Sequence, residues 1–75
     1  MKLSDVEINK KCVIKSVGVS DEKIRTRLME LGMVAGYEVC VKKRSVLNKT
    51  LLVVFNSMCF TIKSNLAKEI VVVYA

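Results

Sequence analysis

Three cysteines are the side chains of this sequence best suited to chemistry, as nucleophiles or as ligands for a soft metal. Cys12, Cys40 and Cys59 lie far apart, with no Cys-x-x-Cys pair, and the chain has no histidine. A cysteine nucleophile needs a base or positive charge beside it. Lys42 lies two residues after Cys40, but alternation along any strand places such residues on the same face, so this spacing does not indicate a catalytic pair. Histidine is the commonest general base and zinc ligand. We therefore expect no catalytic residue, no cofactor and no structural metal site, while adventitious metal binding to an exposed thiol stays open.

The densest charge is the basic run Lys42-Lys43-Arg44, which Lys49 and Lys10-Lys11 could extend in space. Thirteen Lys and Arg against seven Asp and Glu give a net charge of +6. This charge favours an anionic partner, which can be nucleic acid, acidic lipid headgroups or an acidic protein, and the sign alone does not choose among them. The run is interpreted either as a docking patch or as a solvated strand end that keeps the protein in solution.

The length and composition favour one small domain, residues 1–75, with 52% hydrophobic residues to build a full core. An odd number of distant cysteines argues against a disulfide framework and favours free thiols in a reducing compartment. No apolar run approaches the ~20 residues of a spanning helix, and the first residues lack the apolar segment of a signal peptide. We expect a soluble, cytoplasmic protein without membrane insertion, and self-association stays open.

The stretch from Ser20 to Val39 predicts a helix, a tight turn and a strand. The Ser20 hydroxyl can accept hydrogen bonds from the first turn of a helix, and the acidic pair after it suits the positive end of the helix dipole. Ile24, Leu28 and Leu31 recur at i, i+4 and i+7, which predicts one buried face. Gly32 can turn left-handed and end the helix. The residues after it predict a four-residue turn over 34–37 and then a strand.

The rest of the chain predicts short strands joined by tight turns. The five expected strands cover residues 12–17, 38–44, 50–55, 58–62 and 70–74. Residues 3–8 predict at most one helical turn or an arm, 45–49 an exposed loop, 56–57 a hairpin turn and 64–68 one capped helical turn. Short strands without a long crossover favour a curved antiparallel sheet that closes on itself. The predicted fold class is mainly β, an SH3-like small β-barrel with one α-helix of about three turns and a short C-terminal helical turn.

Residues 51–55 and 70–74, in two of these strands, are apolar at every position, so both faces of each strand carry apolar side chains and neither strand can leave one face in water. We expect the buried face of the helix to cover part of the outside of the barrel. The N-terminal arm or another protein would cover the rest.

The outward side of the helix carries candidate contact residues. Met29 lies about 140° from the centre of the apolar stripe, beside Arg25, and an exposed methionine is an adaptable contact residue. Asp21 with Arg25 and Arg27 with Glu30 are spaced to form ion pairs along the helix. We expect Arg27, at the edge of the stripe, to rest its charged group on a backbone carbonyl.

A longer motif joins the helix, the turn and the strand. It consists of Arg27-Leu28-x-x-Leu31-Gly32-Met33-Val34-x-Gly36-x-x-Val39. This motif resembles the signature of the ferrous iron transport protein A family, FeoA, whose domain also occurs as the C-terminal SH3-like domain of some metal-dependent repressors. The resemblance extends over nearly the whole chain. Ala35 stands where the family commonly has proline, and Asn9-Lys10 where it commonly has proline-glycine, but proline is not required for a turn.

The resemblance implies a non-catalytic adaptor or regulator of ferrous iron uptake that docks on the cytoplasmic part of the membrane transporter FeoB. Family membership supplies the partner, whereas the residues supply a basic face and surplus apolar surface. The predicted partner-binding residues are Arg25, Met29, Met33, Lys42, Lys43 and Arg44.

The alternative is a small-barrel nucleic-acid-binding module, or a module associated with a transcription regulator. Phe55 and Phe60 argue against nucleic acid because they lie within apolar strands rather than forming exposed stacking platforms. The chain also has no helix-turn-helix pattern for reading DNA.

Overall fold

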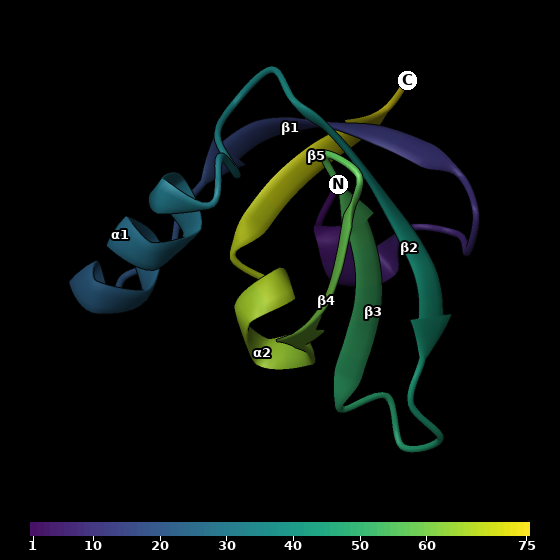
Figure 1. Cartoon of the computed structure of the whole chain (residues 1–75). Coiled ribbons are helices and arrows are strands. Elements are labelled where there is room, and N and C mark those ends of the chain that lie inside the picture. Colours follow the sequence, from purple (N-terminus) through teal and green to yellow (C-terminus); the bar gives the residue numbers. More distant parts are fainter.

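The computed structural model describes the whole chain, Met1–Ala75, as a five-stranded antiparallel sheet with short helical segments (Figure 1). The sheet order is β4-β3-β2-β1-β5. The strands are β1 (Lys11–Val17), β2 (Glu38–Arg44), β3 (Thr50–Phe55), β4 (Met58–Lys63) and β5 (Ile70–Tyr74). The helical segments are η1 (Leu3–Asp5), α1 (Glu22–Glu30) and α2 (Ser64–Ala67). The predicted mainly β fold class is confirmed, and every predicted strand is present to within one residue at each end.

The tight turns set the register of the strands. Asn56 and Ser57 have φ values of 51° and 65°, as a two-residue hairpin turn with both central residues left-handed requires. Phe55 is therefore paired with Met58, and the whole of β4 follows in register along β3. The predicted hairpin is confirmed.

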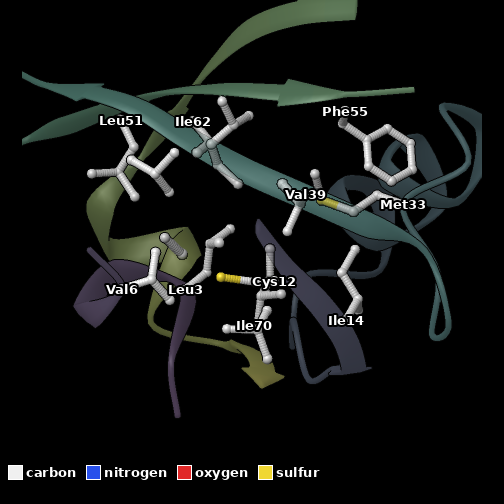
Figure 2. Packing of buried hydrophobic residues seen from close by; sticks show 14 of the residues in the cluster. Leu3, Val6, Cys12, Ile14, Met33, Val39, Leu51, Phe55, Ile62 and Ile70 are labelled. Carbon is white, nitrogen blue, oxygen red and sulfur yellow. The ribbon is translucent and has the colours of Figure 1, made fainter. Parts of the chain in front are cut away.

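The core lies inside the curved sheet and is closed by the N-terminal arm. It contains 16 buried side chains, drawn from every strand and from η1 (Figure 2). Leu3 and Val6 are 0% and 1% exposed, so the arm fills one end of the barrel rather than lying on its outside. The arm is also tied to β5, because the Val72 N–H donates to the Met1 carbonyl at 2.7 Å. The predicted helical turn or arm is confirmed.

Hydrogen bonds at both ends fix the limits of α1. The Asp21 carboxylate accepts from the backbone N–H groups of Lys23 and Ile24, at 3.0 and 3.3 Å, so Asp21 is the N-cap. The prediction of Ser20 as the cap is wrong by one residue. At the other end Gly32 has φ +92°, and the Met33 N–H donates to the Leu28 carbonyl at 2.9 Å. The left-handed glycine end is confirmed.

The predicted buried face of α1 is only partly buried. Leu28 is 5% exposed, but Ile24 and Leu31 are each 39% exposed. In Figure 1 α1 lies to one side of the strands, and Leu28 is its only buried residue. The helix consequently leaves the outer face of β5 open, where Val71 and Val73 are 38% and 39% exposed. The expected covering of part of the barrel's outside by α1 therefore does not extend to β5.

Two further local predictions are wrong. The ion pairs expected along α1 do not form, because the Asp21 carboxylate caps the helix and the Arg25 guanidinium donates to the Val19 carbonyl at 3.3 Å. The only ion pair joins Lys10 to Glu7 at 2.9 Å. α2 has no side-chain cap. The Ser64 hydroxyl instead donates to the Asn48 carbonyl and ties α2 to the β2–β3 loop. None of the helices is long and apolar enough to span a membrane.

Candidate partner-binding surface

α1 presents the first group of predicted contact residues. Met29 is 56% exposed, and Arg25 is exposed on the preceding turn with one hydrogen bond to the barrel. Ile24 and Leu31 add half-exposed apolar surface on another side of the same helix. We call these four residues the α1 surface. The arrangement offers apolar contact area beside one positive charge, which suits binding to another protein.

Met33 does not belong to this surface. Its side chain is 0% exposed and lies in the core close to Val39 and Phe55 (Figure 2). The glycine end of α1 turns the chain inward at this point, so the residue after Gly32 packs inside. The prediction of Met33 as a partner contact conflicts with this placement, and we no longer assign it that role.

The basic run at the end of β2 divides into two free lysines and one engaged arginine. The pairing of β2 with β3 shifts between Val41 and Lys43, and this irregularity leaves both Lys42 and Lys43 exposed. Arg44 is half-buried, and its Nη2 donates to the carbonyls of Ser4 and Val6. A guanidinium held on two backbone carbonyls serves the fold, and we therefore correct its predicted role as a partner contact.

The structure does not bring the predicted contact residues together on one face. Figure 1 shows α1 on one side of the barrel and the end of β2, with the loop after it, on the other. Lys10 does not extend the basic run either, because its ammonium pairs with Glu7 and lies 5.1 Å from the centre of the Tyr74 ring. That Glu7 partner also raises the pKa of Lys10. The sequence analysis missed Lys63, which the strand register places opposite Thr50 beside the loop.

The three thiols are separate and differ in accessibility. Cys12 and Cys40 are buried, Cys59 is exposed, and all three are free. Burial raises the pKa of the Cys12 thiol, and the neighbouring Cys40 raises it further. Nowhere does the fold gather three or more histidine, cysteine or acidic side chains in a group that could hold a metal ion.

The sequence of the whole barrel, including the helix and its glycine end, matches one family. The model of the FeoA domain matches residues 1–74. The chain belongs to the FeoA family. No curated protein matches it. It is a small protein associated with ferrous iron transport.

Solved structures agree with this assignment. The FeoA protein from Chlorobium tepidum is 32% identical, with a TM-score of 0.92 over 99% of this chain and 70% of that one. The FeoA of Stenotrophomonas maltophilia, a prokaryotic SH3 domain protein solved with zinc, is 33% identical, with a TM-score of 0.83 over 96% of this chain and 88% of that one. IdeR of T. acidophilum shares the fold alone, at 17% identity and a TM-score of 0.83, where this chain spans 34% of that protein. The predicted SH3-like FeoA domain is confirmed.

Proposed function

We propose that this FeoA protein is a non-catalytic adaptor that docks through its α1 surface on the cytoplasmic part of a FeoB-type ferrous iron transporter and regulates transport. Family membership supports the partner. The Stenotrophomonas maltophilia relative is described as a candidate activating factor of bacterial ferrous iron transport. The observation that carries the proposal is the apolar side chains that α1 leaves exposed.

Most side chains of the short helix α1 are exposed. Of its nine residues only Leu28 is buried, whereas Met29 is 56% exposed and Ile24 39% exposed. The Asp21 cap and the Gly32 end hold the helix in one conformation before any partner binds. A preorganised apolar helix face loses little conformational entropy on docking and is a common recognition element for a groove in a partner.

Lys42 and Lys43 have a different role in this proposal. They lie away from α1 and are exposed and unpaired, so they raise the rate of encounter with an acidic surface more than they hold the complex together. The apolar side chains of α1 lose their contact with water on binding, and they instead set the rate at which the complex dissociates.

The experiment is a measurement of association and dissociation rates on the immobilised cytoplasmic domain of the transporter. Met29→Ala should speed dissociation, whereas the double variant Lys42→Gln/Lys43→Gln should slow association and weaken its dependence on salt. Met58→Ala is the matched control, because Met58 is an exposed methionine on β4, at 41%. Absence of binding by the wild-type protein, or equal effects of the two methionine variants, would contradict docking through α1.

The alternative function, a nucleic-acid-binding module, is tested with the same purified protein. Binding to a random oligonucleotide should be undetectable at physiological salt if the protein is an adaptor. A nucleic-acid binder would lose affinity by about 0.7 to 0.9 log unit per decade of salt for each phosphate neutralised, and Met29→Ala would hardly change it. Micromolar oligonucleotide binding without binding to the transporter domain would replace the adaptor proposal with this alternative.

A further inference from the structure

The tip of the β2–β3 loop carries the two most exposed large apolar side chains of the protein. Val46 is 102% exposed and Leu47 is 72% exposed. Single exposed apolar side chains are ordinary, but two adjacent ones at the end of a projecting loop place most of their apolar surface in water. The α1 surface does not include them, since the loop lies on the other side of the barrel (Figure 1).

The loop is firmly built, so this exposure is a property of the fold. The Asn48 N–H donates to the Ser45 carbonyl at 2.9 Å, which makes Val46 and Leu47 the central residues of a β-turn. The Ser45 hydroxyl accepts from the N–H groups of Lys49 and Thr50, at 2.9 and 3.1 Å. The central side chains of a turn closed in this way point outward and cannot fold back onto the core.

Lysines surround the base of this loop. Lys49, Lys63 and Lys68 line one open hollow beside it, in which Asp5 is the only acidic residue. Lys43 lies with Ser45 and Thr50 in a hollow that has no acidic residue at all. None of these four lysines forms an ion pair, because the only ion pair of the structure is Lys10 with Glu7. Two apolar side chains therefore project from a loop whose base is positively charged. We call Val46 and Leu47, together with the four lysines, the loop-tip surface.

We propose that the loop-tip surface binds the surface of an anionic phospholipid bilayer, with Val46 and Leu47 entering the interfacial region and the lysines meeting the headgroup phosphates. Apolar residues that penetrate beside cations at headgroup level are the usual features of interfacial binding. Nucleic acid fits less well, because aliphatic side chains offer no ring on which bases stack. An acidic protein would need a pocket shaped for the tip, whereas a bilayer accepts a projecting tip without one. Binding at the interface requires no spanning helix.

The test is sedimentation of the purified protein with vesicles of phosphatidylcholine, with and without phosphatidylglycerol. The protein should sediment with the anionic vesicles and not with the neutral ones. Val46→Ser/Leu47→Ser should reduce partitioning about tenfold or more, because most of the apolar surface that enters the interface is lost. Lys49→Gln and Lys63→Gln should each reduce it about fivefold, and this effect should shrink as salt rises. Unchanged thermal midpoints would show that these exposed substitutions leave the fold intact.

Matched controls on α1 keep the proposal falsifiable. Met29→Ser and Lys23→Gln change an exposed apolar residue and an exposed lysine away from the loop, and both should bind the vesicles like the wild type. Three results would overturn the proposal: no binding to anionic vesicles, full binding by the double loop variant, or equal losses in the α1 controls. If the wild-type protein does not bind vesicles and the loop variant loses binding to the immobilised cytoplasmic domain of the transporter, the tip is assigned to a protein partner instead. Because the vesicles contain no transporter, failure here leaves docking through α1 untouched.

Discussion

Arg44, at the end of β2, donates a hydrogen bond of 3.1 Å from Nη2 to the backbone carbonyl of Ser4, which lies 40 residues earlier in the chain. The same nitrogen also donates to the Val6 carbonyl. Leu3 and Val6 belong to the core, so Arg44 fastens the arm that closes one end of the barrel. A charged residue at the end of a basic run thus stabilises the fold across a long separation in sequence.

Replacing this arginine should therefore destabilise the protein. Arg44→Met keeps most of the apolar stem but removes the donors, and we expect it to lower the free energy of unfolding by about 1 to 3 kcal/mol. Lys43→Met is the control, because the Lys43 side chain is exposed and makes no hydrogen bond or ion pair, and this change should alter stability by less than about 0.5 kcal/mol. Urea denaturation followed by circular dichroism gives both values. Equal midpoints for the two variants would show that the arm does not depend on Arg44.

The N-terminal cap of α1 gives a second prediction, because Asp21 rather than Ser20 caps the helix. Asp21→Ala should cost about 1 kcal/mol, because its carboxylate satisfies two backbone N–H groups of the first turn. Ser20→Ala should be nearly neutral, since Ser20 is exposed and its hydroxyl makes no hydrogen bond to the helix. Thermal unfolding of the two variants measures the difference. A larger loss for Ser20→Ala would restore the serine as the cap.

The strands and turns were predictable because their causes are local. The β-branched runs, the Asn56-Ser57 turn and the glycine end of α1 each act within a few residues, and the structure places them where the sequence indicates. The burial of α1 was not predictable in the same way. Periodicity identifies the residues that share a face, such as Ile24 and Leu31, but the position of the helix relative to the sheet decides what that face contacts.

The candidate surface was harder to predict because its members depend on contacts distant in sequence. Nothing near Arg44 in the sequence indicates that η1 will lie beside it. Lys63 joins the lysines near the β2–β3 loop only through the register of β3 and β4. Met33 differs, because the residue after a glycine helix end commonly folds back onto the helix, and this local rule already argues against a role at the surface.

Gly32 gives the third prediction, which separates backbone strain from crowding. A Cβ at this position would lie 3.6 Å from Cε1 of Phe55, an ordinary contact, but the φ of +92° disfavours any side chain. Gly32→Ala should therefore lower stability by ~1 kcal/mol or more through the backbone alone. Gly36→Ala is the comparison, because Gly36 has φ +97° and nothing within 4 Å of the added Cβ, so its cost should be similar. An unchanged midpoint for Gly32→Ala would disprove the left-handed helix end.

The last prediction concerns the Cys12 thiol and the loss of stability in alkali. Cys12 is fully buried, and burial raises its pKa above the ordinary value of 9.0. Above pH 9.0 the unfolded chain releases this proton while the native protein still holds it, so the native state binds more protons. Stability should then fall as pH rises from that value towards the raised pKa, and the thiol should cause no change below it.

Cys12→Ala removes this titration. The variant should be less stable at every pH because of the cavity, but between about pH 9 and pH 10 its stability should fall less steeply than that of the wild type. Cys59→Ala is the control, because it removes a thiol that is exposed rather than buried, and it should leave the slope unchanged. Lys10 also has a raised pKa, but its stabilisation is lost only above 10.5, beyond this range. Urea midpoints measured across this pH range give the slope of stability against pH for each protein. Equal slopes for wild type and Cys12→Ala would show that the buried thiol does not cause the loss of stability in alkali.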